Sequence, residues 1–156
     1  MKAIKIYLDT SVISMLDNPD LGAVTRKFFE LAKQRGCQFV ISEIVKKEID
    51  GITNTNKGAA ASQIIESLNC VLLPYSQESY DLARTYVLEG ILTENHVNDL
   101  RHVAYATVFG CSVIVSWNRR HIAKPIKIQK LNACNIKNNY PAIVIYTPEE
   151  FLILYK

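Results

Sequence analysis

The N-terminal segment has the alternation of apolar and polar residues that is typical of a β-strand. Within Ala3–Leu8 every second residue from Ile4 onward is isoleucine or leucine, and this period of two residues predicts a strand. Further short apolar runs predict four more strands, at Gln38–Ile41, Cys70–Leu73, Ser112–Val115 and Ala142–Ile145. The run that ends at Val115 has no polar interruption after Ser112, which indicates a strand buried on both faces.

Between these strands the apolar residues recur with the spacing of helices. Helices are predicted over Leu21–Gln34, from Ser42 onward, and over Ala59–Leu68, Gln77–Glu89, Asn95–Phe109 and Ile128–Lys137, with a last helix opened by Thr147-Pro148-Glu149-Glu150. The stretch Gly51–Gly58 is polar and aperiodic, so a mobile loop is expected there. Strands that alternate with helices predict an α/β fold whose mostly parallel sheet is covered by helices on both faces.

In parallel sheets of this kind, ligands bind beyond the carboxyl ends of the strands. Three acidic residues from separate segments are expected near that edge. Asp9 directly follows the first strand, and the alternative is that it only caps the next helix. Glu48 lies beside the apolar stripe of its helix, where it could instead pair with a lysine. Asp99 lies on a small, apolar helical face, where it could instead favour the helix dipole.

Three carboxylates brought together would repel one another and raise their pKa values unless a cation neutralised them. Carboxylate oxygens select hard divalent ions, so the expected cofactor is Mg²⁺ (or Mn²⁺). Such an ion acidifies water and stabilises charge on phosphate oxygens, which is the chemistry of phosphodiester hydrolysis.

The charge of the chain is divided unevenly. Residues 1–99 contain ten Lys/Arg and thirteen Asp/Glu, a net charge of −3, whereas residues 100–156 contain eight and two, a net charge of +6. No acidic residue lies between Leu100 and Pro148. A basic segment of this kind suits a polyanion such as RNA, and the alternative is an ordinary solvated basic face.

Length and composition indicate one soluble domain over residues 1–156. A hydrophobic content of 49% is sufficient for a core, and no apolar run approaches the ~18 residues of a membrane span. No signal peptide is expected either. The four cysteines form no C-x-x-C pair, so reduced thiols and a cytoplasmic location are expected, with a disulfide or zinc framework as the alternative; they are Cys37, Cys70, Cys111 and Cys134.

Three segments, Ile6–Ile13, Asn98–Ala106 and Ile114–His121, together resemble the PIN-domain family in their order and spacing. Ser42 followed by Glu48 is similar to the second acidic position of that family, and Thr147–Phe151 to its frequent closing helix. The resemblance therefore extends over nearly the whole chain.

The resemblance implies a three-layer α/β/α sandwich with a five-stranded sheet, and metal-dependent endoribonuclease activity. Carried over position by position, Asp9, Glu48 and Asp99 match the catalytic, metal-binding acids, while Thr10 and Ser116 match small polar residues beside them. Many members are toxins of toxin–antitoxin pairs of the VapC type. An antitoxin protein and a second copy of the chain, in a homodimer, are therefore further expected partners.

The chain departs from the commonest family pattern at Asn118, where many relatives have Asp. An amide carbonyl can ligate a metal but brings no negative charge, so we expect one tightly held ion, with any second ion recruited by the substrate phosphate. Arg119, Arg120 and Lys124 follow immediately and are expected to hold the RNA backbone. The alternative function, favoured by Asn118, is a PIN-like domain that binds RNA or a protein without cutting it.

Other residues near these motifs are interpreted as structural. His102 and His121 flank the same region and are expected to be structural histidines, with assistance to proton transfer as the alternative. Trp117 is expected to pack in the core rather than stack on a base. A haloacid-dehalogenase-like phosphatase would need a second Asp where Ser11 stands, and a von Willebrand-type metal motif fails at Ile13. No G-x-S-x-G motif indicates a serine hydrolase.

Overall fold

The computed structural model describes residues 2–52 and 55–156. In these residues five strands form one sheet in the order β3-β2-β1-β4-β5, and every neighbouring pair is parallel. The strands are β1 (Lys5–Leu8), β2 (Gln38–Ser42), β3 (Val71–Leu73), β4 (Val113–Val115) and β5 (Val144–Tyr146). The predicted α/β fold with a parallel five-stranded sheet is confirmed.

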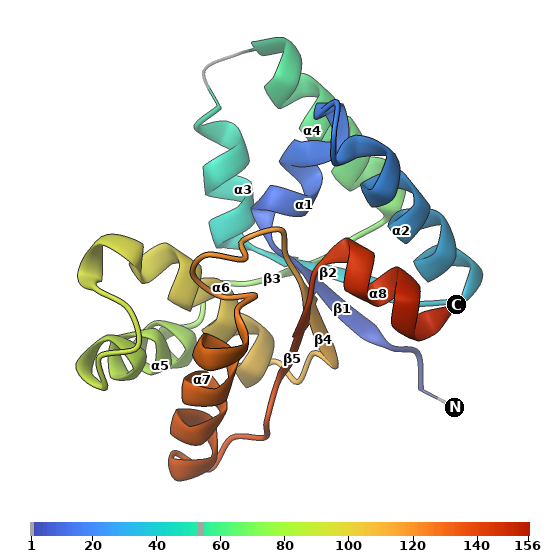
Figure 1. The fold of residues 1–156 in the computed structure, drawn as a ribbon. Coiled ribbons are helices and arrows are strands. Elements are labelled where there is room, and N and C mark those ends of the chain that lie inside the picture. The colour runs from blue at the N-terminus through green and yellow to red at the C-terminus, as the bar shows by residue number, and fades with distance from the viewer. Residues whose placement is uncertain (1, 53–54) are drawn as a thin grey trace.

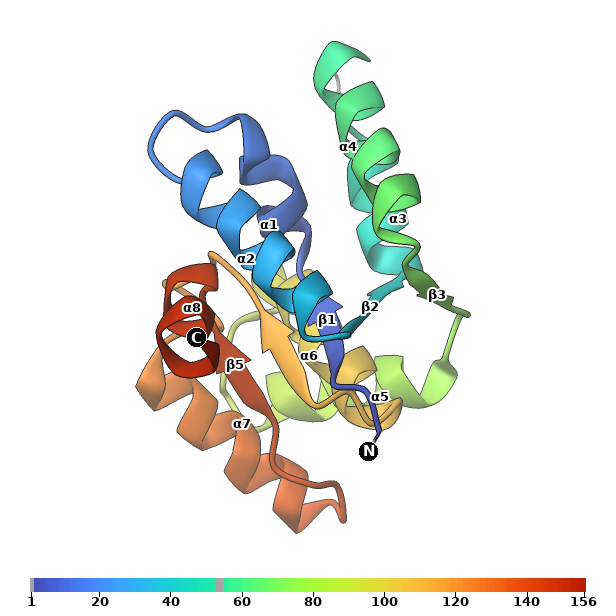
Figure 2. The ribbon, with the colours of Figure 1, turned by 90° about the vertical axis from the view of Figure 1, so that its right-hand side faces the viewer.

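Helices cover both faces of this sheet (Figures 1 and 2). On one side lie α2 and α8, on the other α5, α6 and α7, while α1, α3 and α4 extend from the carboxyl edge (Figure 1). The α-helices are α1 (Thr10–Ser14), α2 (Gly22–Gln34), α3 (Glu43–Asp50), α4 (Thr55–Leu68), α5 (Gln77–Leu88), α6 (Val97–Val108), α7 (Pro125–Lys137) and α8 (Pro148–Tyr155); the short 3₁₀ helices are η1 (Met15–Asp17) and η2 (Glu94–His96).

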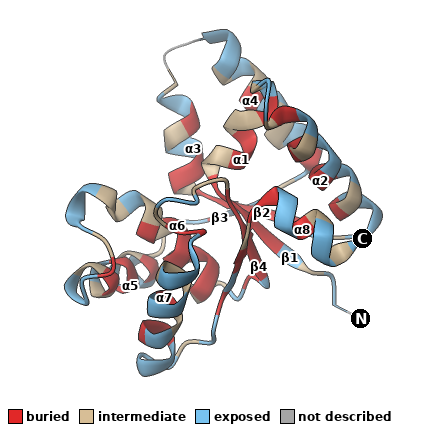
Figure 3. Ribbon diagram, in the orientation of Figure 1, coloured by how far each residue is buried: buried red, intermediate tan, exposed pale blue. Residues whose placement is uncertain are grey.

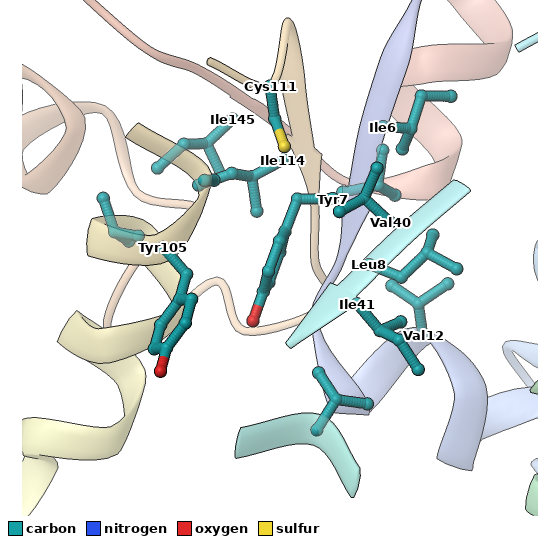
Figure 4. Close-up of a cluster of buried hydrophobic side chains, with 14 of the residues drawn as sticks. Ile6, Tyr7, Leu8, Val12, Val40, Ile41, Tyr105, Cys111, Ile114 and Ile145 are labelled. Atoms are coloured by element: carbon teal, nitrogen blue, oxygen red, sulfur yellow. The ribbon is translucent and has the colours of Figure 1, made fainter. Parts of the chain in front are cut away.

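The central strand β1 is buried on both faces (Figure 3). Ile6, Tyr7 and Leu8 are each 0% exposed, although the alternating pattern groups Tyr7 with the polar positions. A parallel sheet covered by helices on both sides buries successive residues of its central strands. A tyrosine can be buried in such a strand because its ring is apolar and only its hydroxyl needs a hydrogen-bond partner. Figure 4 shows the Tyr7 ring crossing a cluster of apolar side chains that includes Ile114 and Ile145.

Local signals explain several helix starts. The Ser42 hydroxyl accepts a hydrogen bond from the backbone N–H of Ile44 and caps α3. At α8 the Thr147 hydroxyl accepts from the N–H of Glu150, whose carboxylate accepts from the N–H of Thr147, which is a reciprocal capping box. The starts predicted for both helices are confirmed.

Some element boundaries differ from the predictions. The loop expected over Gly51–Gly58 is wrong in its second half, since α4 begins at Thr55; residues 53 and 54 lie outside the described residues. The first turn of α4 is polar because it is exposed. Helix α7 starts at Pro125, three residues before the predicted Ile128, because proline suits the first turn of a helix.

The four cysteines are free, in agreement with the expectation of unpaired thiols. Burial raises the pKa of the Cys111 thiol to about 11, as expected for an inert, structural cysteine. None of the described helices combines the length and apolar character needed to cross a lipid bilayer.

The turn before α2 depends on Gly22. A Cβ at this position would lie 2.5 Å from the backbone oxygen of Leu16, which is too close for any side chain. We expect Gly22→Ala to lower the free energy of unfolding by about 1–3 kcal/mol, because backbone must move to relieve the overlap. The matched control is Gly58→Ala in α4, where a Cβ meets nothing nearer than 3.8 Å. That change should instead stabilise the fold by about 0.4–1 kcal/mol, and urea denaturation of both variants measures the difference.

Candidate metal centre

The acidic residues lie where the sheet topology changes direction. From β1 the chain passes to β2 on one side, and β4 later pairs with β1 on the other side, so the carboxyl end of β1 faces the switch point. Asp9 directly follows β1 there, beside Ser116, which directly follows β4. The switch point of an open parallel sheet is where such folds bind ligands.

Asp9 is only 4% exposed, and its charge is compensated by hydroxyl groups. Its Oδ2 accepts hydrogen bonds from the hydroxyls of Ser11 (2.6 Å) and Ser116 (2.7 Å). Although Asp9 occupies the position before α1, its side chain makes no capping bond, so the helix-cap interpretation is wrong. Its second oxygen, Oδ1, lies 3.4 Å from Nε2 of His102 and is directed away from the two serines.

The same two serines also hold the loop that follows β4. Ser11 Oγ accepts from the backbone N–H of Trp117 (3.0 Å), and Ser116 Oγ accepts from that of Asn118 (2.9 Å). The sequence predicts a supporting role for Ser116 but not for Ser11. The position of Ser11 two residues after Asp9 is the only sequence signal that could have indicated its role.

Glu48 reaches the same region from α3. Its Oε1 accepts from the hydroxyl of Thr10 (3.0 Å) and from Nε2 of His102 (2.5 Å). Burial raises the pKa of Glu48, but the hydrogen bonds and charge of His102, together with Thr10, outweigh burial and lower it overall. The neighbouring Lys47 pairs with Glu43 instead, which argues against the lysine-pairing interpretation of Glu48.

His102 lies among the acidic residues and shares a helix with Asp99, but its bonds to Glu48 and Tyr7 could not be read from the sequence. Its ring is 1% exposed, with Nδ1 hydrogen-bonded to the Tyr7 hydroxyl (2.7 Å), which in turn bonds to Ser42 Oγ (2.7 Å). Burial lowers the pKa of His102, but the negative charges of Asp9, Glu48 and Asp99 raise it overall. The ring is fully bonded, as a structural histidine should be, yet it lies among all three predicted acids.

Asp99 lies in the first turn of α6 with a partly exposed side chain. Its Oδ2 is 3.1 Å from Nδ1 of His121 and 4.0 Å from Nδ1 of His96. Burial raises the pKa of Asp99 and the charge of Asp9 raises it further, and the opposing effects of the histidines and Asn118 are smaller. Asp99 therefore carries an electrostatic strain that a cation would relieve.

Asn118 and the basic residues complete the surroundings of the acids. Asn118 Oδ1 accepts from the backbone N–H of His121 (3.0 Å), and the Asn118 side chain also lowers the pKa of Asp99. Arg119 is exposed, pairs with Glu149 (3.0 Å) and lies over the Trp117 ring. The basic residues Arg120 and Lys124 are also exposed.

Trp117 packs against the core, as expected from the sequence, although its side chain is only half-buried. Its indole N–H donates to the hydroxyl of Thr25 on α2 (2.9 Å), which fixes the ring at the border of the core. The exposed part of the ring is covered by the guanidinium of Arg119.

The donor set of this centre fits a hard divalent ion. Asp9 and Glu48 come from different elements and meet at Nε2 of His102, 3.4 Å and 2.5 Å away, and the charge of Asp99 acts on the same imidazole. Of the three acids, only Asp99 belongs to a group in the described part of the chain whose ligand atoms all lie within 4.8 Å of one another. Carboxylate oxygens are the ligands that Mg²⁺ and Mn²⁺ prefer. The pKa of Asp99 is raised chiefly by burial and further by the charge of Asp9, so a cation beside this carboxylate would favour its ionised form.

Comparison with known proteins gives a likeness of fold. The chain is similar to a chain in the crystal structure of VapBC2 from Rickettsia felis bound to a DNA fragment from their promoter, with a TM-score of 0.60 and 18% sequence identity, over 92% of this chain and 98% of that chain. No family model matches the sequence, and no curated protein matches it. At this identity the likeness supports the architecture, an α/β domain with a parallel sheet flanked by helices, which is consistent with a PIN-like fold.

The electrostatic strain on Asp99 predicts the effect of neutralising it in metal-free protein. A carboxyl whose pKa is raised by folding favours the folded state while it is protonated at low pH and disfavours that state once it ionises. The stability that it contributes is therefore lost as pH rises through the raised pKa. Asp99→Asn should therefore increase the free energy of unfolding at pH 7 in the presence of a chelator. The gain should shrink as pH falls through the raised pKa.

Chemical denaturation at several pH values measures this change. The matched control is Asp81→Asn, the same substitution at an exposed acid on α5, which should alter stability by less than about 0.5 kcal/mol. A decrease in stability of Asp99→Asn at pH 7 would show that its ion pair with His121 outweighs the cost of burying its charge beside Asp9.

Proposed function

We propose that this protein is a ribonuclease that hydrolyses RNA phosphodiester bonds with Mg²⁺ or Mn²⁺ held by Asp9, Glu48 and Asp99. The observation that carries the proposal is that Asp9 and Glu48 both meet Nε2 of His102 at the carboxyl edge of the sheet, where the charge of Asp99 acts on the same ring. The raised pKa of Asp99 supports it, because a carboxylate whose charge is disfavoured by burial and by Asp9 gains from a bound cation.

When bound, the ion would neutralise phosphate oxygens and acidify the water that attacks phosphorus. The residues of the chain itself orient the carboxylates for this task. Ser11 and Ser116 fix Oδ2 of Asp9, so that Oδ1 is the oxygen available to a ligand. Thr10 and His102 hold Oε1 of Glu48 in the same way. Hydroxyl and imidazole groups that orient ligands in this manner strengthen metal binding.

Asn118 has a supporting role in this proposal. Its Oδ1 accepts a hydrogen bond from the N–H of His121, and its side chain lowers the pKa of Asp99 without adding charge. The carbonyl oxygen has a second lone pair, so ligation of the ion by Asn118, as the family resemblance implies, is compatible with this bond. The missing charge at Asn118 favours a second candidate function, an RNA- or protein-binding domain with weak or no cleavage.

The RNA backbone is proposed to contact Arg119, Arg120 and Lys124, which are exposed beside the acidic centre. Trp117 is half-buried beneath the Arg119 guanidinium, and its outer face can stack on a base once Arg119 moves to a phosphate. A nuclease needs basic residues that bind the RNA phosphates next to the metal centre. These residues must not form ion pairs with the acids that bind the metal.

We further propose that the chain acts as the toxin of a toxin–antitoxin pair, as a homodimer. The support is the likeness of fold to a chain of the VapBC2 complex, a toxin–antitoxin assembly. Co-purification of the chain with the product of a neighbouring gene tests this proposal directly, and size-exclusion chromatography tests the dimer.

The nuclease proposal predicts that cleavage of labelled single-stranded RNA requires Mg²⁺ or Mn²⁺ and depends on the acids. Removal of a group that merely orients a ligand lowers metal affinity or activity by about 10–100-fold, so removal of a ligand in Asp9→Asn or Asp99→Asn should lower the cleavage rate by about 100-fold or more. Gel analysis of timed reactions with and without EDTA measures these rates.

The control for this experiment is Asp81→Asn, which removes an exposed acid far from the centre along the chain and should cleave like wild type. Equal cleavage by wild type and both active-site variants would identify a contaminating nuclease. Tight RNA binding without metal-dependent cleavage would support the binding-domain candidate.

The basic surface predicts a salt-dependent affinity. Charge reversal in the double variant Arg119→Glu/Arg120→Glu should weaken RNA binding and reduce the slope of log affinity against log salt by about 0.7 for each phosphate that is no longer neutralised. Lys33→Glu, at the exposed end of α2, is the matched charge reversal on another surface. Fluorescence anisotropy at several salt concentrations measures the slope. An unchanged slope would show that these arginines belong to an ordinary solvated face that does not bind RNA.

A further inference from the structure

A second group of metal-binding side chains lies beside the acidic centre. His96 from η2, Asp99 from α6 and His121 from the loop after β4 each offer one ligand atom, and these atoms all lie within 4.8 Å of one another. The two imidazole rings are neighbours, with centroids 4.0 Å apart. Two histidines from separate segments of the chain therefore converge on one carboxylate oxygen.

The chemistry of this group differs from that of the acidic centre. Imidazole nitrogens suit borderline transition ions such as Zn²⁺, whereas Mg²⁺ takes oxygen ligands and water. Two histidines and one carboxylate form a donor set known from zinc sites that retain an open position. The group can therefore discriminate among ions that the carboxylates alone would bind less selectively.

The spacing is close to that of a metal site. Ligands that lie about 2.0–2.2 Å from a tetrahedral Zn²⁺ are separated from one another by roughly 3.4 Å. Asp99 Oδ2 lies 3.1 Å from Nδ1 of His121 and 4.0 Å from Nδ1 of His96, so small rotations of the side chains suffice. The side chains are 39% (His96), 24% (Asp99) and 24% (His121) exposed, which leaves access for an ion and for water as a further ligand.

The third histidine of the chain is committed elsewhere. Both ring nitrogens of His102 already face partners, Tyr7 on one side and Glu48 on the other. The three histidines therefore have two different roles. His102 is buried and links Tyr7 to Glu48, whereas His96 and His121 are partly exposed and face Oδ2 of Asp99.

We propose that His96, Asp99 and His121 form a second metal position, selective for a borderline transition ion of the Zn²⁺ class. Asp99 is shared between this position and the acidic centre. Because Asn118 contributes no charge, the two histidines supply the ligands that a second acid would otherwise provide. The proposal concerns metal binding alone and does not depend on RNA cleavage.

Zn²⁺ binding to the full chain, measured by isothermal titration calorimetry, tests the proposal. The double variant His96→Gln/His121→Gln should bind Zn²⁺ about 100-fold or more weakly, since even an outer-shell partner is worth about 10–100-fold. The control is Glu94→Gln, which changes an exposed acid of the same 3₁₀ turn that pairs with Arg84 and should bind Zn²⁺ like wild type.

A second measurement uses the wild-type chain and so does not depend on the folding of any variant. Nuclear magnetic resonance of the imidazole nitrogens should show the signals of two histidines, His96 and His121, shifting with Zn²⁺ while those of His102 do not. Absence of Zn²⁺ binding, or shifts at His102 only, would overturn the proposal. Abolished Zn²⁺ binding in Asp9→Asn but not in the histidine variants would assign the ion to the acidic centre and would also overturn it.

Discussion

A carboxylate that is almost fully buried needs groups that compensate its charge, and the arrangement around Asp9 follows from this requirement. Two serine hydroxyls satisfy one oxygen, and the imidazole of His102 faces the other. These groups come from α1, from the end of β4 and from α6, so the compensation of one charge ties three elements to the end of the central strand. The geometry of the candidate site is thus part of what organises the carboxyl edge of the sheet.

The network continues beyond the acids into the core. The Tyr7 hydroxyl connects His102 to Ser42, and Ser42 also caps α3, the helix that carries Glu48. One chain of hydrogen bonds therefore links the core of the sheet, the orientation of an acid and the start of its helix. Buried networks of this type are stabilising only when every member has its partners, which restricts substitution at each position.

The sequence predicts those features that depend on neighbouring residues. The five strands, the start of α3 at Ser42 and the capping of α8 by Thr147 follow from local patterns. Asp9 is singled out by its place after a strand, Glu48 by the apolar stripe of its helix and Asp99 by a small, apolar helical face. The contact of His102 with Glu48 and that of His96 with His121 cannot be predicted in this way, because they join segments remote in sequence. The polar stretch before Gly58 does not predict the start of α4, because an exposed first turn of a helix needs no apolar residue.

The ion pair between Arg119 and Glu149 connects the loop after β4 to α8 and affects how Arg119 can bind another anion. Glu149 belongs to the first turn of α8, which packs against α2 on the far side of the sheet from α6. A phosphate that recruits Arg119 must displace this carboxylate, leaving it at the positive end of its own helix, where an acid is favourable. Release of the arginine therefore costs little free energy, and an incoming anion can capture the guanidinium without disturbing the fold.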